Sequence, residues 1–420
     1  MGFRFIHTGD LHLDSPMRGL ATLGDDPRVK TAANASRDAF GRLVDRAIEE
    51  RVDAFLIAGD LWDGDWNDVD AGLLVQREAK RLRDAGIGTF AILGNHDAAS
   101  HVTDRIRDID IHLFPTTAPT SVRCGGAVLH GMSYPQREMR HNIAAVYPPA
   151  DPERINVGLL HTSLDGTRGH GRYAPCRLTD LAPKAYDYWA LGHVHTREIL
   201  AHELAKDGGT VAYCGVLQGR HIGETGPKGA WLVEIDAPGA LPRLTSVDLP
   251  LVEWVRAEAD LSEGVSPKAA IRAALETAAE AVADLLVVRL VLVGETARHH
   301  RLRGEIGALT KDAAMEAAAL AGSRILLARL KIETTPIGEA PPLLPVGFNE
   351  RLTKAATDEA VVEAAAAEIA DILNAIDALG PTLEAEWPEL AAARDTGDFS
   401  ALLQEAARRV AEEIGSEDRS

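Results

Sequence analysis

Five short clusters of aspartate, asparagine and histidine carry residue types that bind divalent metals. In chain order they are Asp10-Leu-His12, Gly59-Asp60, Gly94-Asn95-His96-Asp97, a single His161, and Gly192-His193-Val-His195. Their oxygen and nitrogen donors suit Mn, Fe or Zn and do not suit a metal that prefers thiolates. A carboxylate such as Asp60 can bridge two cations about 3.5–4 Å apart, the separation that two-metal hydrolases use. The clusters therefore predict metal-assisted hydrolysis.

The spacing of the clusters adds to this prediction. A single DxH or GD pair arises by chance in many chains, but here each of five clusters follows an apolar run. Residues two apart in an extended chain point to the same side, so Asp10 and His12 are expected to reach one site, as are His193 and His195. The neighbouring glycines are expected to permit sharp bends and a close approach of the backbone: Gly59, Gly94 and Gly192.

The elements that hold these clusters alternate in type up to about residue 240. Strands are expected in the apolar runs at 3–10, 52–60, 87–97, 155–163, 186–195 and 210–215. Helical spacing of apolar residues covers 33–50 and 73–85. The alternation predicts a layered α/β domain at 1–240 whose sheets are flanked by helices. Polar clusters at strand exits are where such folds gather their ligands.

Two further units follow this first one. Residues 249–335 predict a βαβαβ unit for binding or positioning, with a helix capped by Ser266 and Pro267. Residues 336–420 combine a proline-rich linker with an acidic, alanine-rich helical tail. That tail either packs on its own chain or docks a partner, and one of its faces is apolar: Val361, Val362, Ile369, Ile372, Leu373 and Ile376.

Composition and charge narrow the class of protein. The net charge is −19, of which −12 falls on residues 336–420, with 18 acidic and 6 basic side chains. This balance gives no support to nucleic-acid binding. No basic leader or long apolar segment is present, so a cytoplasmic protein without a membrane span is expected. The three cysteines fit a reducing compartment without disulfides: Cys124, Cys176 and Cys214.

The order D-x-H, GD, GNHD, H, GHxH resembles the calcineurin-like metallophosphoesterase superfamily. The stretches HTGDLHLDSP, AGDLWD, LLHTSLDG, LGHVH and QGRHIGETGPKGAWLVEID resemble, within it, the SbcD-type DNA repair exonucleases of the YhaO-like branch. The resemblance covers residues 3–236. It implies a metallophosphoesterase β-sandwich flanked by helices, with a small α/β capping domain and a C-terminal helical segment. It also implies a homodimer and an SMC-like coiled-coil ATPase as partner.

The resemblance further assigns roles to single residues. It implies two divalent ions, Mn²⁺ foremost, with Fe, Zn or Mg as alternatives, and a metal-bound hydroxide as nucleophile. The first ion would be held by Asp10, His12 and His195, the second by Asn95, His161 and His193, and Asp60 would bridge both. His96 would protonate the leaving oxygen, and Asp97 would orient its ring. Arg220 and His221, in the QGRH stretch, would line the substrate groove.

The function expected is that of a metal-dependent DNA phosphodiesterase, an exonuclease in DNA repair. Two alternatives remain open: a phosphodiesterase or phosphatase for small nucleotides, and a mainly structural subunit that regulates an ATPase complex. Other polar residues near the motifs have plainer interpretations. His7 and His130 are expected in the core or behind the ligands, and Asp14 and Asp63 are expected to orient ligands.

Overall fold

The structure is a computed structural model, which covers the chain with gaps. It describes residues 2–13, 15, 17, 20, 23, 26–62, 69–99, 110–164, 173–201, 209–321, 324–337, 354–358, 361–363, 366, 369, 388–396 and 398–417. Asp14 and Asp63 lie outside these residues. So do most of the proline-rich linker and the tail residues Ile372, Leu373 and Ile376.

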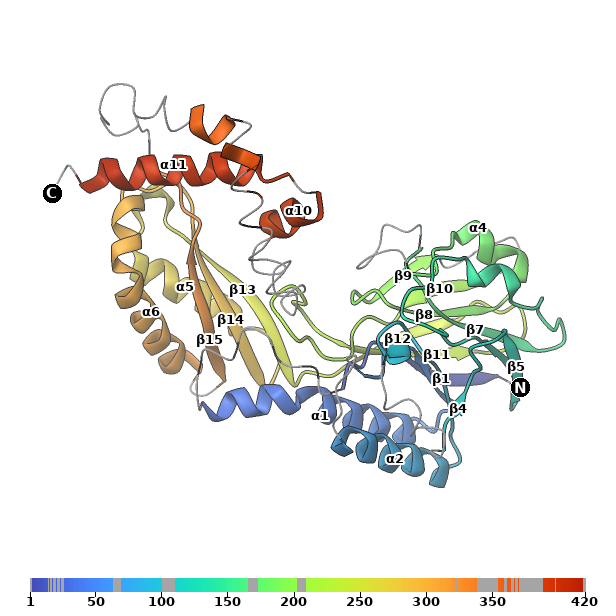
Figure 1. The fold of residues 1–420 in the computed structure, drawn as a ribbon. Coiled ribbons are helices and arrows are strands. Elements are labelled where there is room, and N and C mark those ends of the chain that lie inside the picture. The colour runs from blue at the N-terminus through green and yellow to red at the C-terminus, as the bar shows by residue number, and fades with distance from the viewer. Residues whose placement is uncertain are drawn as a thin grey trace.

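Two mixed six-stranded sheets form the N-terminal half of the molecule (Figure 1). The first has the order β12-β11-β1-β2-β3-β4, with β1 parallel to β2 and β2 parallel to β3. Its strands are Phe3–Thr8 (β1), Ala54–Ala58 (β2), Gly88–Ile92 (β3), His112–Leu113 (β4), Gly229–Ile235 (β11) and Arg243–Asp248 (β12).

The second sheet has the order β5-β6-β7-β8-β10-β9, with β6, β7, β8 and β10 parallel. Its strands are Thr120–Cys124 (β5), Ala127–Gly131 (β6), Ile155–His161 (β7), Tyr188–Gly192 (β8), Glu198–Ala201 (β9) and Thr210–Tyr213 (β10). The six expected strand regions each contain a strand: β1, β2, β3, β7, β8 and β10.

The two sheets pack face to face and are covered on the outside. Phe5 and Leu56 from the first sheet and Val157 from the second belong to one buried cluster between them. Helices α1 (Pro27–Glu49) and α2 (Val69–Asp84) cover the outer face of the first sheet. Short elements, including α4 (Leu178–Leu181), cover the outer face of the second. The expected sandwich flanked by helices is confirmed.

A third, three-stranded sheet follows in the chain. Its strands β13 (Val252–Asp260), β14 (Leu285–Val293) and β15 (Ile325–Ile332) are parallel and lie in that order. Helices α5 (Pro267–Ala278) and α6 (His299–Ala321) pack on one face of it. Ser266 caps α5, as predicted, by accepting a hydrogen bond from the backbone N–H of Ala269.

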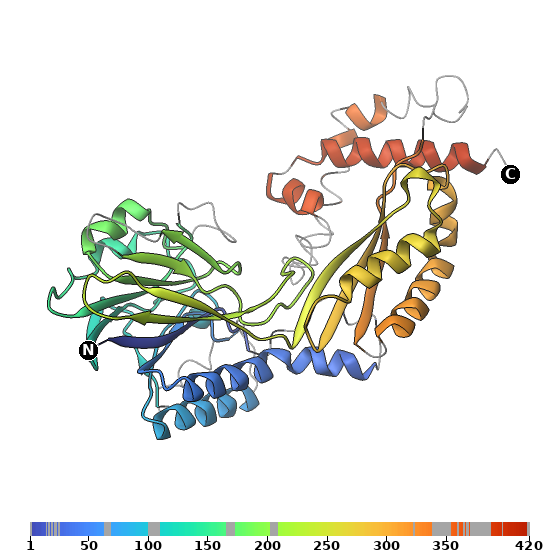
Figure 2. The same cartoon turned by 180° about the vertical axis from the view of Figure 1, so that it is seen from behind.

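Helix α1 joins this third sheet to the sandwich. Arg28 lies in its first turn, and the guanidinium of Arg28 donates a hydrogen bond to the carbonyl of Ile325 at 2.7 Å. One buried apolar cluster contains Phe40 of α1 together with Val287 and Leu326 of the third sheet. Figures 1 and 2 show α1 running beneath both parts, so the two parts share packed core along this helix.

The described tail forms helices α10 (Pro388–Thr396) and α11 (Ser400–Glu417), so the helix expected in the last segment is confirmed. In both views α11 crosses the far end of the third sheet (Figures 1 and 2). Ala391, Ala393 and Phe399 form a small buried cluster of the tail's own. None of the described helices is long and apolar enough to cross a bilayer.

Candidate metal centre

All five sequence clusters meet at the edge where strands of both sheets end. Asp10 follows β1, Asp60 follows β2, and Asn95 follows β3 in the first sheet. His161 is the last residue of β7, and His193 directly follows β8, in the second sheet. Parallel neighbouring strands end at the same edge of a sheet. Residues 150 positions or more apart in sequence are therefore brought together there.

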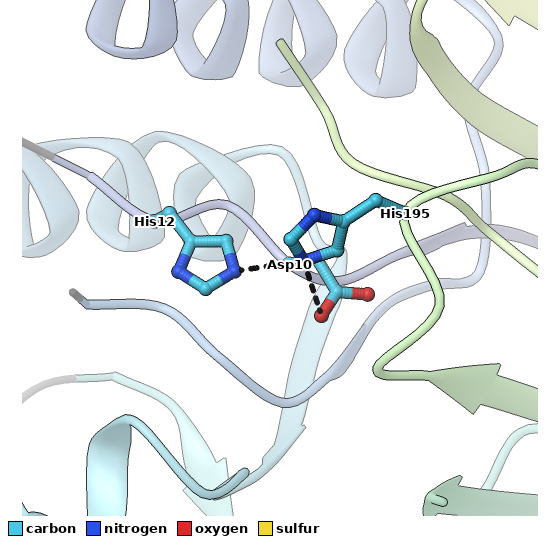
Figure 3. A group of neighbouring side chains, drawn as sticks. All are labelled: Asp10, His12 and His195. Atoms are coloured by element: carbon cyan, nitrogen blue, oxygen red, sulfur yellow. Dashed lines mark hydrogen bonds and ion pairs between the residues drawn. The ribbon is translucent and has the colours of Figure 1, made fainter. Parts of the chain in front are cut away.

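The first predicted ligand group is closely spaced. Figure 3 shows Asp10, His12 and His195 facing one another. The two imidazole Nε2 atoms are 3.2 Å apart, and Nε2 of His195 is 3.9 Å from Oδ1 of Asp10. One potential ligand atom from each of the three residues lies within 4.8 Å of the others. The Asp10 carboxylate also accepts from the backbone N–H of His193, at 2.9 Å, which ties the two sheets together here.

The second predicted group centres on His161. Its Nδ1 faces the carbonyl of Ala58 at 2.9 Å, so Nδ1 carries a proton and Nε2 is the nitrogen that faces the other donors. That Nε2 faces Oδ1 of Asn95 at 2.9 Å and Oδ2 of Asp60 at 3.4 Å. The two oxygens are acceptors, so either a proton on Nε2 or a metal ion between the three atoms would satisfy them. The ring of His193 lies beside this group, 5.2 Å from that of His161 between centroids.

Asp60 stands between the two groups. Its Oδ2 is 3.4 Å from Nε2 of His161 and 3.8 Å from Nε2 of His12. Its Oδ1 accepts from the backbone N–H of His96 at 3.0 Å. This is the place that a bridging carboxylate needs, since one side chain reaches toward both sets of donors.

The charges around the centre favour a positive charge at His161. Burial alone would lower the pKa of His161, but the charge and hydrogen bond of Asp60 outweigh burial and raise it to about 9. Burial alone would likewise raise the pKa of Asp60, yet the charge of His161 holds it well below its usual range. Burial raises the pKa of Asp10, against the pull of His161 and His195. A proton on His161 thus fills the place of a cation.

The backbone at the centre is not extended, contrary to the expectation for the DxH step. Asp10 and His12 have φ of 47° and 41°, Asp60 has 52° and His193 has 98°. These four are half of the eight described non-glycine residues with positive φ. Such conformations cost about 1–3 kcal/mol each and cluster at functional sites. The side chains still converge, because the chain turns tightly after each strand instead of continuing it.

Two of the expected glycines are required by close approach. A Cβ on Gly94 would lie 2.2 Å from Oδ1 of Asp60, and a Cβ on Gly192 would lie 2.1 Å from the carbonyl of Ala58. Any side chain at either position would displace the strand ends that carry the donors. The prediction that these glycines permit close backbone approach is confirmed.

His96 lies at the partly exposed rim of the centre, and Asp97 is buried beneath it. His96 groups with His12 and Asp60 as a potential ligand, although the sequence assigned it a proton-transfer role. The Asp97 carboxylate accepts from the backbone N–H groups of Trp62 and Gly94, at 3.0 and 2.9 Å, and so fixes two of the loops. Burial, together with the charge of Asp60, raises the pKa of Asp97 to about 7. That Asp97 orients the His96 ring stays a prediction.

Sequence reasoning missed one residue that contacts the centre. Oε1 of the buried Glu224 is 2.6 Å from Nδ1 of His195. Arg220 and His221, predicted for the substrate groove, lie beside this carboxylate, at 3.1 and 3.5 Å. The signal was present: Glu224 lies in the same QGRHIGETGPKG stretch that carries the resemblance. His7 and His130 are buried, as expected.

The donors fit two divalent ions. The grouped atoms are carboxylate oxygens and imidazole nitrogens, with the Asn95 oxygen beside them, and they are largely buried. Hard-to-borderline cations such as Mn²⁺, Fe²⁺ and Zn²⁺ prefer this chemistry. Burial raises the pKa of the Cys214 thiol, which senses the charge of Asp10, well above its usual range, so this thiol remains protonated.

Two family models match the chain. Residues 3–197 match the calcineurin-like phosphoesterase model, and residues 254–335 match the middle domain of the metallophosphoesterase YhaO. The first match contains all seven predicted metal ligands. The second coincides with the three-stranded sheet and its helices.

Curated relatives support the same assignment. An uncharacterized metallophosphoesterase YhaO from Bacillus subtilis is 37% identical over 242 residues, 55% of this chain and 57% of that protein. A DNA double-strand break repair protein Mre11 from Sulfurisphaera tokodaii is 28% identical over 256 residues, 59% of this chain and 62% of that protein. The chain thus matches less than two thirds of either relative. Residues 3–197 are thus similar to calcineurin-like phosphoesterase domains, and residues 254–335 to the middle domain of YhaO.

Proposed function

We propose that this chain is a dinuclear metal-dependent DNA phosphodiesterase, an exonuclease or end-processing nuclease. The observation that carries the proposal is the place of the Asp60 carboxylate, within 3.4 Å of one predicted ligand group and 3.8 Å of the other. Divalent ions bound there would lower the pKa of a coordinated water and offset the charge on the phosphoryl oxygens. Mn²⁺ is our first choice of ion, because the family resemblance of the sequence implies it; the donor set also suits Fe or Zn.

The chain's own residues supply orientation and a proton. Asp60 accepts from the backbone N–H of His96, which places the His96 ring beside that of His12, with 4.9 Å between centroids. From this rim position, His96 would donate its proton to the leaving oxygen as the phosphorus–oxygen bond breaks. Asp97 holds the loop from which His96 projects.

DNA as the substrate is the finer part of the proposal. It is supported by the similarity to a relative named as a DNA double-strand break repair protein and by the QGRH stretch. The acidic balance of the chain favours the rival, a phosphodiesterase or phosphatase for small nucleotides. A homodimer, a coiled-coil ATPase partner and a cytoplasmic location are proposals of the same kind, the last supported by three free cysteines.

The test is cleavage of end-labelled linear DNA with Mn²⁺, Mg²⁺ or EDTA. Wild type is compared with Asp60→Ala and His96→Ala, and with matched controls Asp284→Ala and His300→Ala, whose residues lie in the three-stranded unit, where the described residues form no potential ligand group. We expect Mn²⁺-dependent shortening that both site variants lose and both controls keep. Uncut DNA together with metal-dependent hydrolysis of a small chromogenic phosphodiester would keep the centre and transfer the function to the rival. Inactivity on both substrates would favour a structural subunit.

A further inference from the structure

A buried carboxylate outside the predicted ligand set touches the metal centre. Glu224 lies on the connection between β10 and β11 and is 5% exposed. Its Oε1 is 2.6 Å from Nδ1 of His195. The carboxylate accepts, so Nδ1 carries the proton and the lone pair of His195 is on Nε2. That Nε2 is the atom that faces His12, at 3.2 Å.

Glu224 is surrounded by basic groups. Arg220 contacts it twice, through the backbone N–H to Oε2 at 2.7 Å and through the guanidinium to Oε1 at 3.1 Å. Nε2 of His221 is 3.5 Å away. A carboxylate paired with Arg220 therefore lies against the far side of the His195 ring.

Arg220 connects this carboxylate to the loop after β1. The guanidinium that pairs with Glu224 also approaches the hydroxyl of Ser15 at 3.4 Å, five residues beyond Asp10. The ligand loop after β1, the ligand loop after β8 and the segment 220–224 are thereby joined through one ion pair. The side chain of Arg220 is only 11% exposed, which fits a structural role in holding these segments together better than contact with solvent.

We infer that Glu224 is the positioning residue of the first metal site. The inference rests on the dinuclear centre of the proposed function. Through its hydrogen bond, Glu224 fixes the tautomer and the ring orientation of His195 and makes Nε2 a stronger metal ligand. The corresponding atom of His161 faces a neutral carbonyl, that of Ala58. Glu224 would therefore act on the ion that Asp10, His12 and His195 would hold and not on the other.

The test is a calorimetric titration of the full chain with Mn²⁺, for wild type, Glu224→Gln and Glu224→Asp. The matched control is Glu78→Gln, since Glu78 is also buried and paired with arginines, Arg77 and Arg81, but lies on α2. We expect wild type to bind two ions. Glu224→Gln should bind one of them about 10- to 100-fold more weakly. Glu224→Asp should lie between, and Glu78→Gln should match wild type.

A second measurement separates positioning from folding. In ¹⁵N-labelled protein without metal, the side-chain resonances of His195 should indicate the Nδ1–H tautomer in wild type and a mixture in Glu224→Gln. Wild-type affinity for both ions in Glu224→Gln would overturn the inference, as would equal loss in Glu78→Gln or unfolding of both Glu224 variants. Wild type that binds two ions but cleaves no DNA would refute only the DNA assignment. Wild type that binds fewer than two ions would refute the centre and this inference together.

Discussion

The sandwich and the three-stranded unit both alternate parallel strands with helices, yet only the sandwich gathers chemistry at its strand ends. Asp, Asn and His side chains converge at or just after the ends of β1, β2, β3, β7 and β8. Four of these residues have positive φ. Strands β13, β14 and β15 end at Asp260, Val293 and Ile332, and among the described residues no potential ligand group forms there. Parallel β/α architecture supplies an edge where groups can meet; residue type and a strained exit from the strand make that edge a site.

Removing the charge of Asp60 should produce the largest difference in effect between the sandwich and the three-stranded unit. Asp60→Asn keeps the size of the side chain and removes the charge that faces both donor groups. We expect metal-dependent phosphodiesterase activity to fall at least about 10²–10³-fold, the loss typical for removal of one stabilising group. Steady-state rates with Mn²⁺ measure this. Asp284 is an exposed aspartate before β14, and Asp284→Asn should keep the wild-type rate. Equal losses in the two variants would contradict a specific role of Asp60 in catalysis.

Replacing a glycine by alanine should change the free energy of unfolding in opposite directions in the sandwich and in the three-stranded unit. In Gly192→Ala the new Cβ would lie 2.1 Å from the carbonyl of Ala58, so we expect destabilisation by about 1–3 kcal/mol from overpacking. In Gly304→Ala, within α6, nothing lies within 4 Å, and the free energy of unfolding should rise by about 0.4–1 kcal/mol. Urea unfolding of both variants measures the two signs. Gly192→Ala with wild-type stability and metal affinity would contradict the close packing of the strand ends.

The buried histidine of β1 should make the sandwich sensitive to acid. Burial lowers the pKa of His7 from 6.5 to about 3, so the folded chain leaves it neutral while the unfolded chain protonates it below 6.5. Stability is therefore full above pH 6.5 and is lost as pH falls from 6.5 to 3, by about 1.4 kcal/mol per pH unit for one group. His7→Gln should lack this component. The difference in unfolding free energy between wild type and variant, measured at pH 7.5 and 5, should shrink by about 2 kcal/mol; a constant difference would contradict a neutral His7.

The smallest expected effect lies in the three-stranded unit. Ser266→Ala removes the hydroxyl that accepts from the N–H of Ala269 at the start of α5. Loss of such a cap costs about 1 kcal/mol of stability. Thermal unfolding should show the loss while Mn²⁺ affinity stays unchanged. A change in metal affinity would mean that the three-stranded unit acts on the centre after all.

The sequence predicted what local patterns determine and missed what long-range packing determines. Buried parallel strands such as β2 and β7 are continuous apolar runs, and a predicted ligand stands at or just after the end of each, so both were visible. Strands β5 and β12 have mostly exposed residues and β4 has only two, so their pattern resembles that of loops. The antiparallel pairing of β11 with β1 joins residues more than 200 positions apart, which spacing cannot predict.

The same limit applies at the centre. Residue type and order indicated the side chains that the structure brings together, because residues that can donate to a metal are few and each stands near a strand end. The left-handed backbone of Asp10 and His12 was predicted wrongly, because alternation within a strand says nothing about the turn that follows it. Glu224 was missed because its partner, His195, is 29 residues away and the contact depends on the path of the connection after β10.

The most direct test of the account is the position of Mn²⁺ in a crystal of the full chain, read from its anomalous scattering. We predict two peaks about 3.5–4 Å apart, with Asp60 between them, one beside Asp10, His12 and His195 and the other beside Asn95, His161 and His193. A single peak, or peaks away from these strand ends, would contradict a dinuclear centre built by the two sheets.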